Sequence, residues 1–183
     1  APPAAAPRAP LVTLEAGGVG EAAAPGRGND AGVTGGGAVR LRVAGRRLGV
    51  AFGAAGLAPA TVTLARGQAR LTRVPVELDL TAAVRARRLE LIAGVGLAAA
   101  ALAVTGQGFA ADLGTTRLDL GLHGAVTARW RGGGRVAPFV GLEATLLPRP
   151  YDLAVAGLGE VGRTPLLWVR VVAGAALALD GRF

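Results

Sequence analysis

The feature that most constrains this chain is the alternation of side-chain type between Leu118 and Trp130. One set of alternate positions holds apolar or small residues, namely Leu118, Leu120, Leu122, Gly124, Val126, Ala128 and Trp130. The intervening positions, counted from Arg117 to Arg131, hold the charged and polar residues Arg117, Asp119, His123, Thr127, Arg129 and Arg131. A helix would distribute these charges around its circumference, whereas a strand places them all on one face. The segment is therefore predicted to be a β-strand with one apolar and one charged face.

The same period of two recurs along most of the chain and predicts eight strands. Their expected bounds are residues 10–20, 33–44, 47–57, 69–86, 88–104, 116–131, 135–147 and 165–183. Tight turns at residues 44–47, 86–88 and 132–134 alternate with longer connections at residues 21–32, 58–68, 105–115 and 148–164. This layout is typical of membrane barrels, and it places both chain ends on the short-turn side. The predicted fold class is all-β, an eight-stranded antiparallel up-and-down transmembrane β-barrel over residues 10–183, after a flexible Pro/Ala-rich tail at residues 1–9.

The apolar faces need a partner, and the sequence bears on whether that partner is lipid. Mean hydropathy is +0.46, yet the longest uninterrupted apolar run, Leu91 to Val104, is shorter than the about 20 residues that a spanning helix needs. A closed barrel is the other structure that satisfies its backbone within a membrane. Alternation alone does not say which face is inside. Apolar residues on every strand of so narrow a barrel, together with the terminal Phe183, favour a polar interior, and a soluble β-barrel remains an alternative.

In these features the chain resembles the eight-stranded outer-membrane β-barrels of Gram-negative bacteria, of the OmpA/OmpX-like type. It is also similar to uncharacterised outer-membrane β-barrel proteins of GC-rich bacteria, in the stretch from Leu147 to Leu153 and in Gly162 to Pro165. The resemblance implies a location in the cell outer membrane, with periplasmic termini and tail. It also implies contact with outer-membrane lipid and with the barrel-assembly machinery. The machinery would recognise the C-terminal segment through Phe183, Leu179 and Leu177, which we expect to share one outward face.

The charged faces predict the contents of the barrel interior. Eight strands leave room only for side chains, and an unpaired charge in such an interior costs several kcal/mol. We therefore expect a lumen closed by arginine–carboxylate pairing among Arg73, Glu77, Asp79, Arg117, Asp119, His123, Glu143 and Arg170. Further inward charges nearer the short turns are Arg40, Arg42, Arg85, Arg88, Glu90, Arg129, Arg131, Asp180 and Arg182. Small inward residues such as Gly94 and Gly96 keep a second hypothesis open, a narrow conduit for small solutes with His123 as its gate.

Composition excludes several kinds of catalytic and metal site. The chain has no Cys, no Ser and one His, which removes disulfides, a Ser-His-Asp triad and a multi-His zinc site. We predict a protein that is not an enzyme, with no catalytic residue, cofactor or metal. His123 lies among carboxylates and is a candidate general base or pH sensor, so a lipid-acting barrel enzyme remains an alternative.

Arginine supplies all of the basic charge, and the net charge is +8. Much of it falls at the predicted short turns, in a rim formed by Arg46, Arg47, Arg87, Arg88, Trp130, Arg131 and Arg135. These residues are predicted to contact anionic lipid headgroups of the periplasmic leaflet, or else to solvate the rim and snorkel. Nucleic-acid binding is rejected, because the arginines alternate with an apolar face and lack stacking aromatic residues. Loops 148–164 and 105–115 are candidate contacts for another envelope protein, and the expected role is structural, adhesive or in envelope assembly.

Overall fold

The structure, a computed structural model, describes residues 10–24, 32–64, 67–107, 114–149, 151–155, 159–179, 181 and 183. Within these ranges no helix is long and apolar enough to cross a membrane. The strands are β1 (Leu11–Ala23), β2 (Val33–Ala44), β3 (Leu48–Leu57), β4 (Ala60–Leu64), β5 (Gly67–Ala86), β6 (Leu89–Gln107), β7 (Gly114–Trp130), β8 (Val136–Leu146), β9 (Asp152–Val155), β10 (Gly159–Arg163) and β11 (Leu167–Ala178). The predicted tail at residues 1–9 lies outside the described residues.

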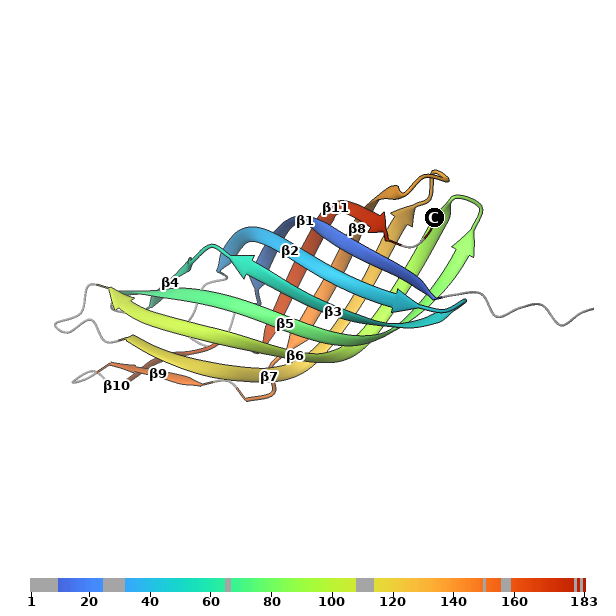
Figure 1. Ribbon diagram of the computed structural model, residues 1–183. Helices are drawn as coiled ribbons and strands as arrows, with labels where there is room; N and C mark the ends of the chain where they lie inside the picture. The colour runs from blue at the N-terminus through green and yellow to red at the C-terminus, as the bar shows by residue number, and fades with distance from the viewer. Residues whose placement is uncertain are drawn as a thin grey trace, which may run out of the picture.

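Eight of these strands close into an antiparallel barrel (Figure 1). Their order is β3-β2-β1-β11-β8-β7-β6-β5, and a pairing of β3 with β5 joins the two ends of the sheet. Closure gives every one of the eight strands a partner on both sides, as a membrane interior requires. The predicted fold class is therefore confirmed.

The three tight turns and the C-terminus lie together at one end of the barrel, which we call the short-turn end (Figure 1). The turn between β5 and β6 consists of Arg87 and Arg88, and Arg87 has a φ of 50°. The turn between β7 and β8 contains Gly133, with a φ of 81°. The Phe183 N–H donates to the Gly134 carbonyl at 3.1 Å, which attaches the chain end to that turn.

The predicted long loops were wrong in two places, because they contain short strands. β4 pairs with the far end of β5, and β9 pairs with β10 as a separate hairpin. The hairpin base is held at Tyr151 and Thr164: Tyr151 N–H donates to Thr164 Oγ1 at 2.8 Å, and Thr164 N–H donates to the Tyr151 carbonyl at 2.9 Å. Strands of four or five residues are too short for alternation to distinguish them from loop.

The barrel wall has uneven height. β5, β6 and β7 contain 20, 19 and 17 residues, whereas β3, β8 and β11 contain 10, 11 and 12. The expected bounds of the last strand, residues 165–183, were too long, because β11 ends at Ala178. The excess length of β5 to β7 projects at the end opposite the short turns, which we call the long-loop end (Figure 1).

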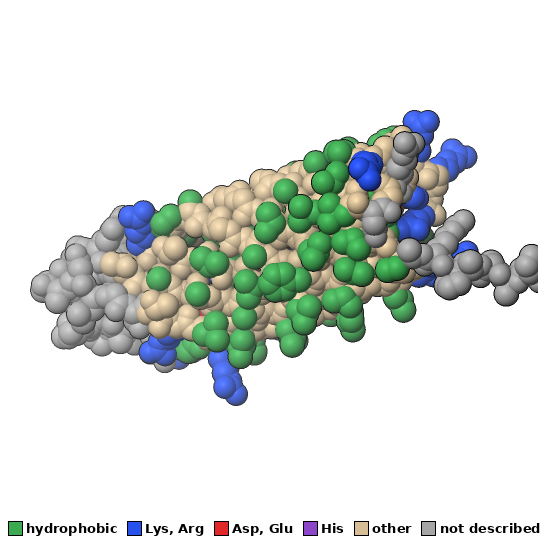
Figure 2. Space-filling view, viewed as in Figure 1, with side chains coloured by type: hydrophobic (Ala, Val, Ile, Leu, Met, Phe, Trp, Pro, Cys, Tyr) green, Lys and Arg blue, Asp and Glu red, His purple; other side chains and the backbone are tan. Residues whose placement is uncertain are grey.

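The two faces of the wall are divided by chemistry as the alternation predicts. Apolar side chains cover the outside, including Leu80, Val95, Leu120 and Leu122, all of which are exposed. Figure 2 shows hydrophobic side chains spread along the wall and basic side chains mainly toward its two ends. The buried side chains include many charged groups. A soluble barrel has the reverse arrangement, so this division favours lipid as the surrounding medium.

Candidate functional site: the charged lumen

The candidate site is the barrel interior, which is filled by ionisable side chains. Seven carboxylate residues are each at most 4% exposed: Glu15, Glu21, Glu77, Asp79, Glu90, Asp119 and Glu143. Arg42, Arg73, Arg129 and Arg170 are buried with them and Arg40 is partly buried, while Arg85, which was expected to point inward, is exposed as a residue with its side chain 33% exposed. The chain's one histidine, His123, completes the set. Because isolated buried charges are costly, the way these groups pair decides whether the interior is stable.

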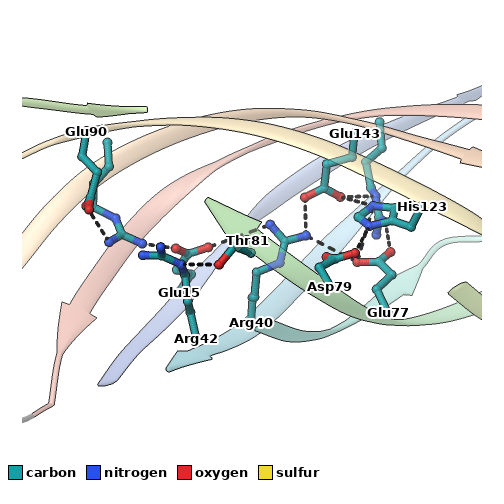
Figure 3. Close-up of polar contacts among 11 residues, drawn as sticks. Glu15, Arg40, Arg42, Glu77, Asp79, Thr81, Glu90, His123 and Glu143 are labelled. Atoms are coloured by element: carbon teal, nitrogen blue, oxygen red, sulfur yellow. Dashed lines mark hydrogen bonds and ion pairs between the residues drawn. The ribbon is translucent and has the colours of Figure 1, made fainter. Parts of the chain in front are cut away.

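A central cluster joins strands from opposite sides of the barrel (Figure 3). Arg40 on β2 donates from Nη2 to Glu143 Oε1 on β8 at 2.5 Å and lies 3.4 Å from Glu77 Oε2 on β5. Arg170 on β11 donates to Glu77 Oε1, and its Nε lies 2.9 Å from Glu143 Oε2. Each of the two arginines therefore contacts both glutamates, and the four side chains come from four different strands. Charge-assisted bonds of this kind are stronger than neutral ones.

Glycine lets partners two strands apart meet on the lumen face. Asp79, Gly96 and His123 are cross-strand neighbours on β5, β6 and β7. His123 Nδ1 lies 2.8 Å from Asp79 Oδ1, above the space that a side chain at residue 96 would fill. In the same way Gly53 separates Arg40 from Glu77, and a Cβ there would lie 3.1 Å from Glu77 Oε2.

At the short-turn end the pairing depends on Glu90. Glu90 on β6 is the cross-strand partner of both Arg85 and Arg129. Its oxygens lie 2.8 Å from Arg85 Nε and 3.1 Å from Arg129 Nη1. Arg129 also donates to Glu15 across the lumen. Glu15 in turn lies 4.0 Å from Arg40, so the ion pairs continue into the central cluster.

At the long-loop end the last pair is Arg73 with Glu21. Arg73 Nη1 donates to Glu21 at 2.8 Å, and its guanidinium lies 4.8 Å from the centre of the Trp168 ring. Glu21 also lies 3.9 Å from Arg170, which links this pair to the central cluster. Asp119 is buried nearby, and its Oδ1 has no hydrogen-bond partner within the described part of the chain.

The ion pairs form one column through the barrel. It runs from Arg85 through Glu90, Arg129, Glu15, Arg40, the Glu77–Glu143 pair, Arg170 and Glu21 to Arg73. Two cavities beside it, one lined by Glu77 and Glu143 and the other by Arg42 and Thr81, have volumes of about 10 Å³ each. Each is about the size that holds one water molecule.

The structure places most, but not all, of the predicted lumen residues together. Glu77, Asp79, His123, Glu143 and Arg170 make direct contacts in the central cluster, and Arg73 joins through Glu21. Asp119 is buried, and its Oδ1 has no hydrogen-bond partner in the described part of the chain. Arg117 is the exception, because it is exposed and its guanidinium lies 4.8 Å from the Tyr151 ring centre at the long-loop end.

Two carboxylates of the lumen, Glu15 and Glu21, were not predicted from the sequence. Both lie on β1, whose apolar residues Leu11, Val12 and Leu14 do not alternate strictly, and Glu21 lies one residue beyond the predicted end of this strand at residue 20. The signal that could have identified them is parity, because Thr13, Glu15, Val19 and Glu21 are all buried on one face.

The expected position of Phe183 was wrong. Leu177 and Leu179 are 39% and 46% exposed, as predicted, but Phe183 is 8% exposed and does not share their outward face. Its ring packs with the core cluster that includes Phe139 and Ala178, and it lies 4.9 Å from the Arg129 guanidinium. The parity argument failed because β11 ends at Ala178, so alternation does not extend to the last residue.

The predicted rim lies at the short-turn end. Arg46, Arg47, Arg87, Arg88 and Arg135 are exposed, as is Trp130, and Arg131 is half-buried. Arg88 and Arg131 belong to the turns and not to the lumen, contrary to the inward placement expected for them. Asp180 and Arg182 and most of loop 105–115 lie outside the described residues, as do the side chains of residues 152–162.

One group in the lumen has the composition of a metal site. Ligand atoms of Glu77, His123 and Glu143 all lie within 4.8 Å of one another, and all three residues are buried. No metal site was predicted from the sequence, because His123 is the chain's one histidine. Carboxylates from other strands complete a set that sequence spacing cannot reveal.

The sequence matches no protein-family model and no curated protein. Among solved structures the barrel is similar to the outer membrane protein OprG from Pseudomonas aeruginosa, with a TM-score of 0.69, 12% identity, and 93% and 96% of the two chains covered. The chain has the fold of a small outer-membrane β-barrel.

Two further structures support this assignment of the fold. Neisserial surface protein A has a TM-score of 0.63 at 10% identity, with 92% of this chain and 97% of that chain covered. A major outer membrane protein from Thermus thermophilus has a TM-score of 0.59 at 14% identity, with 90% and 98% covered. At such identities the likeness of these small outer-membrane β-barrels to this one is a likeness of fold.

Proposed function

We propose that this protein is a non-enzymatic outer-membrane β-barrel with a plugged lumen, and that its role is structural, adhesive or in envelope assembly. The proposed orientation has both termini and the short turns in the periplasm. The observation that carries the proposal is the column of ion pairs that runs from Arg85 to Arg73. It leaves cavities of about 10 Å³, which is far too little for a continuous water-filled path.

Three contacts follow from this placement. The exposed arginines of the rim support contact with anionic phospholipid headgroups of the periplasmic leaflet. The outward Leu177 and Leu179, with Phe183 at the chain end, remain the proposed signal for the barrel-assembly machinery. At the long-loop end, the β9–β10 hairpin supports contact between loop 148–164 and another envelope protein, and loop 105–115 is proposed to share that contact.

Conductance in planar lipid bilayers tests the plugged lumen. The wild-type barrel is expected to give no steady single-channel current, because the lumen is filled by paired side chains. Replacing Glu77 and Asp79 together by Gln and Asn is expected to lower thermal stability and to produce intermittent leak current. A control with Val76→Ala and Leu78→Ala changes the same strand on its outer face and is expected to remain closed. Steady, sizeable current through the wild-type barrel would reject the plug and favour the narrow channel.

A further inference from the structure

His123 has one ring nitrogen bound and the other free. Nδ1 lies 2.8 Å from Asp79 Oδ1, and a carboxylate can only accept, so Nδ1 carries the hydrogen. Nε2 of the neutral ring then carries a lone pair. The side chain is 0% exposed, and Nε2 has no hydrogen-bond partner among the described residues. A buried imidazole fixed in this tautomer by a carboxylate is the usual arrangement of a metal-binding histidine.

Two carboxylate oxygens face this nitrogen. Glu143 Oε2 lies 3.8 Å and Glu77 Oε2 lies 4.0 Å from His123 Nε2 (Figure 3). Both distances are too long for a hydrogen bond. Two ligands of one zinc ion, each bound at about 2.0–2.1 Å, lie at most about 4.2 Å apart. Both separations from His123 Nε2 lie under this limit, and the three ligand atoms lie within 4.8 Å of one another, so binding requires the two carboxylates to draw inward around the ion.

The arginines bind each glutamate mainly through its Oε1 atom, and not through the Oε2 atom that faces His123. Glu143 Oε1 accepts from Arg40 at 2.5 Å, and Glu77 Oε1 accepts from Arg170. The Oε2 atoms that face His123 are held less well: Glu77 Oε2 is 3.4 Å from Arg40. Glu143 Oε2 is 2.9 Å from Arg170 Nε, but the two are not aligned as a hydrogen bond. Each glutamate is thus oriented by one oxygen and presents the other to the histidine.

The charged side chains around His123 do not balance one another. With a neutral His123, the carboxylates of Glu77, Asp79 and Glu143 face two guanidiniums, so one negative charge is in surplus in a buried place. A proton on Nε2 would cancel it, but that N–H would have no acceptor within hydrogen-bond distance. A divalent metal ion more than offsets this charge, and it uses the lone pair.

We propose that Glu77, His123 and Glu143 bind one divalent transition-metal ion in the middle of the lumen, with Asp79 as the positioning residue of the histidine. A ligand set of one imidazole and two carboxylates suits Zn²⁺ among these ions. The ion ties β5, β7 and β8 together and is a structural element of the plug.

The test uses the tag-free full chain refolded in detergent with Zn²⁺ present, because the site is enclosed once the barrel has closed. Bound zinc is measured after desalting, and the imidazole of His123 is followed by ¹⁵N NMR, where the single histidine gives an unambiguous signal. We expect one zinc per barrel, a metal-dependent shift of the Nε2 resonance with Nδ1 still protonated, and a higher unfolding temperature than in chelator. Asp79→Asn is expected to weaken zinc binding by about 10–100-fold.

Matched variants separate a specific site from general charge effects. His123→Gln and Glu143→Gln each remove one ligand and should abolish stoichiometric zinc retention. Glu90→Gln removes a buried carboxylate from the short-turn end and should retain one zinc per barrel. Heat-modifiable gel migration shows which variants have folded. A folded wild-type barrel without retained zinc, or with zinc that leaves the Nε2 resonance unchanged, overturns the proposal, and so does equal retention by Glu143→Gln and wild type.

Discussion

The hydrogen bond between His123 and Asp79 depends on the absence of a side chain at Gly96. A Cβ there would lie 2.6 Å from Asp79 Oδ1 and would also collide with the Leu78 carbonyl oxygen. We predict that Gly96→Ala lowers the free energy of unfolding by about 1–3 kcal/mol, the usual cost of overpacking. Gly124→Ala is the control, because a Cβ there has nothing within 4 Å. Urea unfolding in lipid vesicles compares them, and equal stabilities would contradict the prediction.

Arg170 and Arg117 form a second matched pair, since both were predicted from parity to belong to the lumen network. Arg170 is buried between Glu77 and Glu143, whereas Arg117 is exposed beside Tyr151. Arg170→Met leaves two buried carboxylates short of a partner and is expected to cost about 3–5 kcal/mol. Arg117→Met is expected to cost less than about 1 kcal/mol. Chemical unfolding of the two variants measures the difference, and the prediction fails if they are alike.

Leu122 tests which face meets lipid. It is 56% exposed in the middle of β7, on the apolar outer face. Leu122→Arg is expected to cost about 2–4 kcal/mol in vesicles, the penalty for arginine near the bilayer midplane. Val136→Arg, at the start of β8 near the short-turn end, is expected to cost about 0–1 kcal/mol. Unfolding titrations of both variants provide the check, and a neutral Leu122→Arg would mean that this face does not contact lipid.

Parity predicted which face a residue occupies, and counting from the short turns placed Arg40 nearer that end, but Arg40 belongs to the central cluster with Glu143 and Glu77. The period of two places Arg117 and His123 on one face of the strand. It does not show that Arg117 lies at the mouth of the barrel and His123 in its middle. Partners across the lumen depend on strand register and tilt, which the sequence does not state. For this reason the sequence analysis identified Glu77, Asp79 and Glu143 as a group but did not assign Arg40 to them.

At the scale of elements, the β9–β10 hairpin is an independent unit. It forms its own two-stranded sheet, and the hydrogen bonds between Tyr151 and Thr164 close its base. We predict that replacing residues 152–163 by a short Gly-rich linker leaves the barrel folded and heat-modifiable, with stability within about 1 kcal/mol of wild type. Gel migration and thermal unfolding measure this. Loss of the folded band would show that the hairpin is required for closure.

The predictability of each element followed its length and its surroundings. β7 and β8 alternate without interruption because one face meets the charged lumen and the other lies outside, and their bounds were predicted to within two residues. The bounds of β1 were harder to predict, because Gly17, Gly18 and Gly20 have no side chain that would indicate the face on which they lie. β11 was predicted too long because the final residues leave the sheet and turn Phe183 toward Arg129.

For the whole molecule, the exposed arginines at the short-turn end predict a dependence on lipid charge. Replacing Arg46, Arg47, Arg87 and Arg88 by Gln is expected to weaken association with anionic vesicles by about 1 kcal/mol per arginine at low salt. Binding to zwitterionic vesicles should be unchanged. Co-sedimentation at two salt concentrations measures both. If the variant and wild type respond equally to lipid charge, the rim makes no such contact.

The pairs that cross the lumen also constrain how the barrel is assembled. Arg40 and Glu143 lie on β2 and β8, and Glu15 and Arg129 lie on β1 and β7, so strands from the two halves of the chain supply opposite charges. A sheet of four or five strands would therefore present unpaired charges on the face that later becomes the interior. Those charges are tolerable in water and costly in lipid. The pairs of Glu90 with Arg85 and Arg129 lie within β5, β6 and β7 and can form early, whereas the pairs of β1 and β11 with the opposite wall form only in the final step that brings β1 and β11 together. We expect half-assembled sheets to be excluded from the bilayer, so that insertion and closure occur as one cooperative event.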